Sequence, residues 1–325
     1  MNALKIFSDT LLAPQVLALL KEGVAPHEIL LPDKPVTSVL AKADKDPSFG
    51  LADIAFGQPD LQSVYESEKL KWIQVSSAGF TRYDTAEFRE FAKSRGLLVT
   101  NSSSVYAEAC AQHVVAFMLA HARKLPMGLK SRVANGASEW NALRQQSAVL
   151  GPGQKVLILG YGSIAARVVE LLKPFDMEVI AVRRQPRGDE EVKVVTLEAV
   201  GEELPLADHV INILPDNAES VNYFDASRFG RCKEGSVFYN IGRGTTVDQG
   251  ALYAALKNGP LEAAWLDVTV PEPLPDEHPL WTLENCFITP HTAGGHRDEA
   301  GTLVRHFLGN FRRYLQGEPL KDRII

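Results

Sequence analysis

Residues 155–184 decide the fold that we predict for this chain, and they read KVLILGYGSIAARVVELLKPFDMEVIAVRR. An apolar run leads into a glycine turn, an apolar helical stretch and a second apolar run that ends on two arginines. The turn has the spacing GxGxxA. In this spacing the first glycine permits a tight turn, the second lets a pyrophosphate approach the backbone, and the alanine allows close helix packing. The order strand, turn, helix, strand indicates the first unit of a dinucleotide-binding fold.

The helix after this turn is predicted to begin near Ser163, so that its amide groups and its dipole face a pyrophosphate. We therefore expect Gly160, Gly162, Ser163 and Ile164 to contact the cofactor. A bare structural turn is the alternative, because short glycine patterns also occur without a ligand. The apolar runs on both sides of the turn favour nucleotide binding.

Arg183 and Arg184 stand where the second strand of such a unit usually ends on an acidic residue that binds the ribose. A carboxylate there would repel a 2′-phosphate, whereas a guanidinium would bind it through charge-assisted hydrogen bonds. The pattern predicts NADP as the cofactor, with NAD as a second possibility. The alternative is a solvated loop whose charges balance, made of Arg183, Arg184 and Arg187 with Asp189, Glu190 and Glu191.

Further apolar runs of strand length recur along the chain. In the first 100 residues they are ALKIF, HEILL, ADIAF, KWIQVS and GLLVT. From residue 155 onward they are KVLILG, MEVIAV, VKVVTL, HVINIL, SVFYNI, LEAAWLDV and CFITP. Polar or amphipathic stretches separate most of these runs, which is typical of α/β proteins. We predict a Rossmann domain with a doubly wound parallel sheet for the cofactor and a smaller, flavodoxin-like α/β substrate domain.

Two helices are expected at the crossings between these domains. Residues 105–125 lack Gly and Pro and repeat apolar residues at helical spacing. Near the C-terminus, Leu303, Phe307 and Phe311 form one helical stripe, which is expected to pack back on the first domain. The predicted division is a substrate domain of residues 1–101 plus 292–325 and a dinucleotide-binding domain of residues 102–291.

The composition narrows the class of protein. A net charge of −6 over 325 residues argues against general binding to nucleic acid. No apolar run approaches the roughly 18 to 20 residues that span a bilayer, and Lys5 and Asp9 interrupt the first segment too early for a signal peptide. The three cysteines have no paired metal spacing. We expect a cytoplasmic protein without a metal, a membrane or a nucleic-acid partner.

Three polar segments follow apolar runs in the second half: NIGRGTTVD (240–248), LDVTVPEPLP (266–275) and TPHTAGG (289–295). Strand carboxyl ends form the ligand crevice of open α/β sheets, so the three segments can converge. Arg243 is suited to bind a carboxylate, and His291 can exchange a proton near neutral pH. Glu272 can orient the His291 ring. Taken singly, each has a structural alternative as a surface ion pair, a turn histidine or a loop carboxylate.

With these motifs in order, the chain resembles the D-isomer-specific 2-hydroxyacid dehydrogenases over nearly its whole length. The motifs are GYGSIA, the LP of NILPDN, NxGRGxxVD, DVxxxEPLP, PHTAG and the terminal GEPL. The resemblance implies that Arg243, Glu272 and His291 are the catalytic set. It also implies that Asp267 holds the nicotinamide carboxamide and that backbone amides at Ser77, Ala78 and Gly79 bind the substrate carboxylate. Further cofactor contacts are expected at Leu214, Pro215, Ile241 and Gly294.

The family resemblance also implies a substrate domain formed by the N-terminal part and the last helix. It implies a homodimer through the helix at residues 102–125. The chain departs from the family pattern at Gln112, where an acidic residue is common, and in the residues that follow His291.

We predict an NAD(P)-dependent D-2-hydroxyacid dehydrogenase that reduces a small 2-keto acid such as glyoxylate or hydroxypyruvate. Phosphoglycerate is disfavoured because the segment ADIAFGQPD (52–60) has no Arg or Lys for a second anionic group. Glu272 disfavours a formate dehydrogenase, since those relatives have Gln at this position. An NAD(P)-binding sensor or corepressor of the same fold, without significant turnover, is the alternative function.

Overall fold

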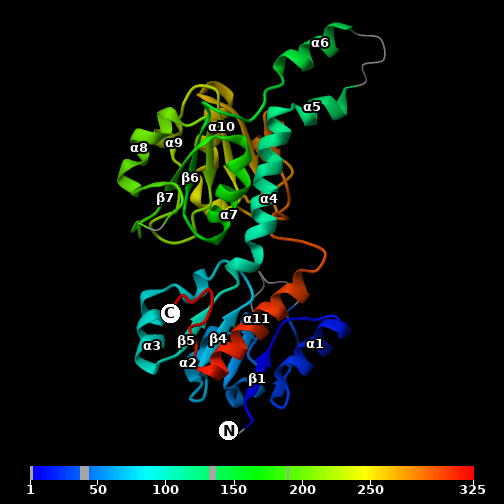
Figure 1. The fold of residues 1–325 in the computed structure, drawn as a ribbon, viewed down its shortest axis with the longest axis vertical. Coiled ribbons are helices and arrows are strands. Elements are labelled where there is room, and N and C mark those ends of the chain that lie inside the picture. Colours follow the sequence, from blue (N-terminus) through cyan, green and yellow to red (C-terminus); the bar gives the residue numbers. More distant parts are fainter. Residues whose placement is uncertain (1–2, 37–43, 132–136, 189) are drawn as a thin grey trace. The chain divides into compact units, whose positions relative to one another are not determined.

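The computed structural model describes residues 3–36, 44–131, 137–188 and 190–325 (Figure 1). The chain divides into two compact units. Unit 1 combines Met1–Tyr106 with Gly295–Ile325, and unit 2 is Ala107–Gly294. These divisions lie a few residues beyond the boundaries drawn from the sequence. Each unit is an α/β fold, so the predicted fold class is confirmed.

Unit 1 is built on a parallel sheet with the strand order β2-β1-β3-β4-β5, which is the flavodoxin-like order. Each of the five apolar runs predicted in this region overlaps a strand. The strands are β1 (Lys5–Ser8), β2 (Glu28–Leu30), β3 (Ile54–Gly57), β4 (Trp72–Val75) and β5 (Leu98–Thr100). The helices are α1 (Pro14–Val24), α2 (Leu61–Glu66), α3 (Ala86–Arg95) and α11 (Glu299–Gln316).

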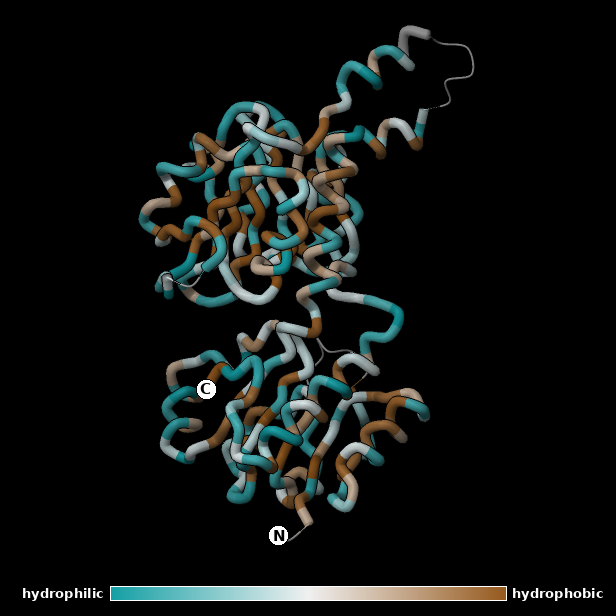
Figure 2. Tube along the Cα trace, in the orientation of Figure 1, coloured by the Kyte–Doolittle hydropathy of each residue, from teal (hydrophilic) through white to brown (hydrophobic). Residues whose placement is uncertain are grey.

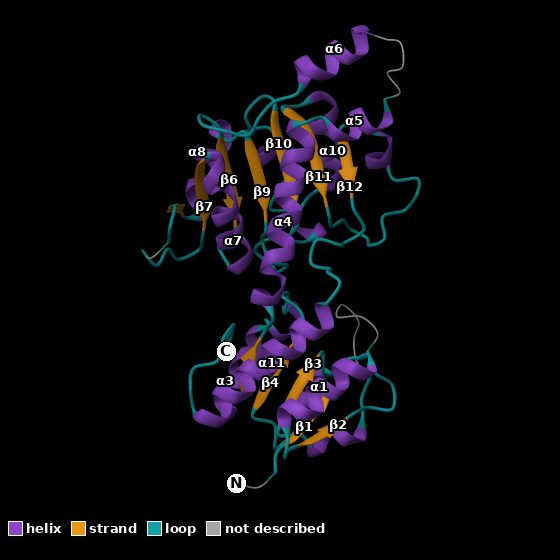
Figure 3. Cartoon of the chain, turned by 45° about the vertical axis from the view of Figure 1, so that its right-hand side comes forward, coloured by secondary structure: helices purple, strands orange, loops and turns teal. Residues whose placement is uncertain are grey.

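The C-terminal helix α11 contributes to the core of unit 1. Its stripe of apolar residues is buried, and Phe307 stacks on Phe56 and Trp72 at ring-centroid distances of 4.7 and 5.3 Å. Helices α1 and α11 lie side by side against the sheet (Figures 1 and 3). Strands β3 and β4 are buried along their whole length, as expected of parallel strands covered on both faces.

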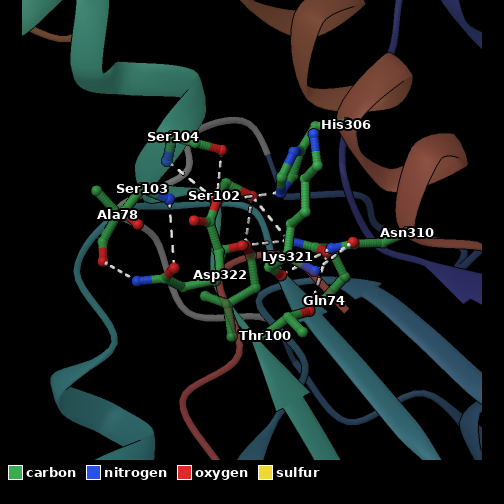
Figure 4. A network of polar contacts seen from close by, with 12 residues as sticks. Gln74, Ala78, Thr100, Ser102, Ser103, Ser104, His306, Asn310, Lys321 and Asp322 are labelled. Atoms are coloured by element: carbon green, nitrogen blue, oxygen red, sulfur yellow. Dashed lines mark hydrogen bonds and ion pairs between the residues drawn. The ribbon is translucent and has the colours of Figure 1, made fainter. Parts of the chain in front are cut away.

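Polar contacts hold the C-terminal tail, residues 317–325, against the rest of unit 1 (Figure 4). Asp322 accepts a hydrogen bond from the Ser104 amide at 3.0 Å and lies 3.3 Å from His306 Nε2. Asn310 on α11 donates to Gln74 on β4 at 2.9 Å. These contacts connect the tail to α11 and to the first turn of α4 (Ser103–Ala122), and they connect α11 to the sheet.

Unit 2 contains a parallel sheet with the strand order β12-β11-β10-β9-β6-β7-β8. The order reverses at β6, which lies between β7 and β9, and this reversal defines the Rossmann arrangement. All seven apolar runs predicted from residue 155 onward contain strands. The strands are β6 (Lys155–Leu159), β7 (Glu178–Val182), β8 (Lys193–Val195), β9 (His209–Asn212), β10 (Ser236–Asn240), β11 (Leu261–Leu266) and β12 (Cys286–Ile288). The helices are α5 (Leu125–Lys130), α6 (Ala137–Gln146), α7 (Ser163–Leu172), α8 (Val200–Glu203), α9 (Ala226–Phe229) and α10 (Gln249–Asn258).

The long helix expected at residues 105–125 ends earlier than predicted. Helix α4 stops at Ala122, and Lys124 has a left-handed φ of 51°. A new helix, α5, begins at Leu125 with Pro126 in its first turn. The left-handed residue ends one helix and proline is favoured at the start of the next, so the chain turns at this point.

Hydrophobic residues gather on the strands inside each unit, and the loops are mostly hydrophilic (Figure 2). Among the described residues, no helix combines the length and apolar character needed to cross a membrane.

Candidate active site

The glycine turn follows β6 and has the shape that a pyrophosphate requires. Gly160 has a φ of +97°, and a Cβ at this position would lie 3.0 Å from the Ile213 carbonyl oxygen. Helix α7 begins at Ser163, as predicted, with Gly162 as its N-cap. A Cβ at Gly162 would meet none of the described atoms within 4 Å. A pyrophosphate can therefore approach the backbone closely at Gly162, and the turn fits a dinucleotide.

The loops after β6, β9 and β10 meet at the point where the strand order reverses. A Cβ at Gly160 would meet the Ile213 backbone, and a Cβ at Gly242 would lie 2.8 Å from the Leu214 carbonyl oxygen. Predicted cofactor contacts Leu214, Pro215 and Ile241 belong to these loops. Open α/β sheets bind their ligands at this kind of position. The geometry thus brings the predicted residues of the first half of the cofactor site together.

Both arginines after β7 form ion pairs. Arg183 Nη1 lies 3.1 Å from Glu190 Oε1, and Arg184 Nη2 lies 2.8 Å from Glu219 Oε2. The Arg184 pair is exposed, with about two thirds of each side chain accessible to solvent, whereas the Glu190 side chain is only 4% exposed. The balanced loop considered as an alternative is therefore present in part, with Glu190 as the partner of Arg183.

Glu272 and His291 form a direct pair. His291 Nδ1 lies 2.8 Å from Glu272 Oε2, and the other carboxylate oxygen accepts a hydrogen bond from the Thr269 amide at 3.1 Å. The two residues follow β11 and β12, which are neighbours in the sheet. Because Nδ1 faces a carboxylate, Nε2 is the ring nitrogen that can transfer a proton to a substrate. The predicted pairing of Glu272 and His291 is therefore present.

Arg243 follows β10, the next strand in the sheet. Its Nη1 donates to the Gly242 carbonyl at 2.7 Å. A Cβ at Gly244 would lie only 1.9 Å from the carbonyl oxygen of Thr269, the residue whose amide holds Glu272. The Arg243 loop therefore packs directly against the Glu272 loop, and the loops that bear all three predicted catalytic residues follow three adjacent strands.

Asp267 has a structural role that the sequence did not reveal. Its carboxylate is 2% exposed and accepts hydrogen bonds from Thr289 Oγ1 at 2.6 Å and from the amides of Thr292 and Ala293 at 2.8 Å. His113 Nε2 lies 3.6 Å away. Asp267 thus ties down both ends of the short loop that carries His291. Its expected contact with the nicotinamide carboxamide stays a prediction, as does the cofactor contact at Gly294.

His113 on α4 was not singled out from the sequence. Its Nε2 lies 3.2 Å from Thr289 Oγ1, and its ring packs on Phe117. Burial lowers the pKa of His113, although the Asp267 carboxylate acts in the opposite direction. A histidine within an apolar helix gave no sign of this contact, because its partner lies 176 residues away in the chain.

The residues expected to bind the substrate carboxylate follow β4 in unit 1. Gln58 Nε2 donates to Ser77 Oγ at 2.9 Å, and Ser77 Oγ donates to the Gly79 carbonyl at 2.6 Å. Asn101 Nδ2 donates to the Ala78 carbonyl at 2.7 Å. Side-chain contacts therefore fix the shape of this loop, and its role in substrate binding stays a prediction.

Comparisons with known proteins agree with this geometry. Residues 115–293 match the family model described as D-isomer specific 2-hydroxyacid dehydrogenase, NAD binding domain. The chain is 32% identical to human glyoxylate reductase/hydroxypyruvate reductase over 260 residues, which cover 78% of this chain and 77% of that protein. It is 28% identical to glyoxylate reductase of Aeropyrum pernix over 325 residues, which cover 97% and 93%.

A solved structure, that of a D-isomer specific 2-hydroxyacid dehydrogenase family protein from Aeromonas salmonicida, matches with a TM-score of 0.73. The sequence identity is 28%, and the match covers 100% of this chain and 99% of that one. The family model spans more than half of the chain, and the human relative matches over more than three quarters of it. This chain therefore belongs to the D-isomer specific 2-hydroxyacid dehydrogenase family.

Proposed function

We propose that this protein reduces a small 2-keto acid to the D-2-hydroxy acid, with NADPH preferred over NADH. The observation that carries the proposal is the 2.8 Å contact between His291 Nδ1 and Glu272 Oε2 at the carboxyl edge of the Rossmann sheet. Relatives named glyoxylate reductase support the substrate class.

His291 is the proton donor in this proposal. When bound, the nicotinamide would supply the hydride, and His291 Nε2 would donate a proton to the carbonyl oxygen of the keto acid. Glu272 keeps the ring in one orientation, while the Thr269 amide keeps Glu272 in place. Arg243 provides a fork of N–H donors for the substrate carboxylate. A sensor without turnover is less well supported, because the chain retains all three catalytic residue types.

The preference for NADPH rests on Arg183, which directly follows β7. A 2′-phosphate at the adenosine ribose would lie next to this guanidinium and would replace Glu190 as its partner. NAD(H) is the weaker cofactor in this proposal. The test is Arg183→Gln, which should lower kcat/KM for NADPH by roughly tenfold or more and leave NADH nearly unchanged. An unchanged NADPH to NADH ratio would contradict the assignment.

Cations near residues 52–60 bear on whether the substrate carries a second anionic group. The segment at residues 52–60 has no cation of its own, but Arg82 Nη1 donates to the Gln58 carbonyl at 3.4 Å. A cation from another part of unit 1 therefore lies beside this segment, and 3-phosphohydroxypyruvate belongs in the test beside glyoxylate and hydroxypyruvate. Initial rates of NADPH and NADH oxidation with these acids test the proposal. No turnover with any of them, while NADPH still binds, would favour the sensor function.

We also propose that the protein is a homodimer that uses the helical segment at residues 102–125. Support comes from apolar side chains exposed at the end of this segment and just beyond it: Leu119, Leu125, Met127 and Leu129. Met127 also lines a groove of about 570 Å³, together with Trp265 and Phe287. Light scattering on the purified protein tests the proposal, and a monomeric mass at micromolar concentration would contradict it. The cytoplasmic location stays a prediction.

A further inference from the structure

The loop after β7 folds around one of its own carboxylates. Glu190 Oε1 accepts hydrogen bonds from the Arg187 amide at 2.8 Å and from Arg183 Nη1 at 3.1 Å. Glu190 Oε2 accepts from the Gly188 amide at 2.8 Å. A guanidinium and two consecutive amide groups that converge on one negative group form the donor set of a small anion site.

Glu190 differs from the other carboxylates that pair with cations nearby. The Arg184–Glu219 and Lys173–Glu191 pairs are solvent-exposed, with more than half of each side chain accessible. Exposed pairs of this kind contribute little to stability. The Glu190 side chain is 4% exposed and has three donors. Its position is therefore built by the loop, whereas the other two pairs are ordinary surface contacts.

Glu190 and its donors lie at the sheet edge where the cofactor is expected to bind. Arg183 is the first residue after β7, and the Gly160 amide donates to the Val182 carbonyl at 3.1 Å. The anion site and the glycine turn therefore lie at the same edge of two neighbouring strands. In a Rossmann fold, residues at this position contact the 2′-hydroxyl or 2′-phosphate of the adenosine ribose.

We propose that the Glu190 carboxylate is an internal stand-in for the 2′-phosphate of NADP(H) and sets the discrimination between the two cofactors. NADP(H) displaces Glu190 from Arg183 and the loop amides, whereas Glu190 stays in place when NAD(H) binds and neutralises Arg183 next to the ribose. This inference rests on the proposed use of NADP(H).

The negative charge of Glu190 supports competition between this carboxylate and the 2′-phosphate for the same donors. Hydrogen bonds from the Arg187 amide, and further ones from Gly188 and Arg183, lower the pKa of Glu190 despite some desolvation. The carboxylate is therefore ionised at neutral pH. Because a carboxylate and a phosphate ester require the same donors, every NADP(H) molecule that binds must release the contacts of Glu190.

The experiment measures dissociation constants of NADPH and NADH by fluorescence titration of the full chain, without a keto acid. Glu190→Gln keeps the size of the side chain and removes its charge. We expect this variant to bind NADPH roughly five- to tenfold more tightly and NADH within about twofold of the unchanged protein. The matched control is Glu191→Gln, which removes the same charge one residue away, where the carboxylate pairs with the exposed Lys173.

Equal tightening by Glu190→Gln and Glu191→Gln would show a general charge effect and overturn the inference. An Arg183→Gln variant separates the inference from the proposed function. If Arg183→Gln weakens NADPH binding selectively but Glu190→Gln leaves the ratio of the two constants unchanged, the NADP(H) assignment stands and the role of Glu190 is wrong. If Arg183→Gln does not alter the ratio, both are wrong. In the double variant, the effect of Glu190→Gln should become smaller, because the shared cation is gone and only the loop amides remain as shared donors.

Discussion

The carboxyl edges of the two sheets both contain a buried aspartate, and the two are held very differently. Asp267, after β11 in unit 2, accepts hydrogen bonds from one hydroxyl and two amides and lies near His113. Asp9, after β1 in unit 1, is 1% exposed and accepts from the Gln58 amide at 2.9 and 3.2 Å from its two oxygens. The same residue type at equivalent places in two parallel sheets is a loop anchor in one and a poorly compensated burial in the other.

Unit 2 uses its anchored carboxylate to position a titratable pair, Glu272 and His291. Unit 1 offers mainly neutral groups at the corresponding edge, among them Gln58, Ser76 and Ser77. The difference indicates that the number of fixed donors, and not burial alone, decides how well a buried carboxylate is compensated. In the proposed mechanism, unit 2 carries the proton chemistry.

The largest expected effect tests whether unit 2 carries this chemistry. His291→Asn removes the proton donor and should lower kcat/KM for keto-acid reduction by roughly 10²- to 10⁴-fold, with little change in NADPH binding. His278→Asn is a matched control, because His278 in unit 2 accepts from the Leu280 amide at a helix start and Asn can do the same. Steady-state kinetics and cofactor titration measure both. A loss below about fivefold would rule out this role for His291.

The next prediction tests whether Asp267 anchors the loop that carries His291. Asp267→Asn leaves one oxygen and one NH₂ group facing the donors of Thr289, Thr292 and Ala293, so that one buried amide loses its acceptor. We expect the free energy of unfolding to fall by about 1 to 3 kcal/mol, and kcat to fall because the His291 loop is no longer fixed. Urea unfolding and kinetics provide the two readouts. Unchanged stability would show that Asp267 is not an anchor.

The last prediction concerns the same substitution in unit 1, at Asp9. Desolvation raises the pKa of Asp9 from 3.8 to about 6, against the lowering by the Gln58 amide. Because the pKa of Asp9 is raised in the folded protein, its contribution to stability is fully present at low pH and is lost as pH rises from about 4 to about 6, by up to about 3 kcal/mol. Asp9→Asn removes this dependence.

Unfolding free energies of the unchanged protein and of Asp9→Asn, compared at pH 4.5 and pH 7.5, test this prediction. The variant should gain stability relative to the unchanged protein at the higher pH, in contrast to the loss expected for Asp267→Asn. An equal difference between the two proteins at both pH values would show that Asp9 titrates normally and would remove the contrast between the units.

Much of the fold could be predicted because its signals are local. Each of the twelve apolar runs overlaps a strand. Central strands of a parallel sheet are buried on both faces, which requires continuous apolar sequence. Helix α7 begins at Ser163 because the glycine turn dictates it. The end of α4 at Ala122 was missed, because the break depends on a left-handed Lys124, and a lysine gives no signal for that conformation.

The sequence by itself determined the residue types of the site, the glycine turn and the position of Arg183 at the end of β7. Only the tertiary structure decided which groups meet. The order β10, β11, β12 brings the loops of Arg243, Glu272 and His291 together, and the fold places His113 beside Asp267. It also decided that Glu190, rather than Glu191, takes the donors of Arg183. Hydrogen bonds are short-ranged and directional, so partners far apart in the chain are fixed by strand order and loop shape, which a residue pattern does not encode.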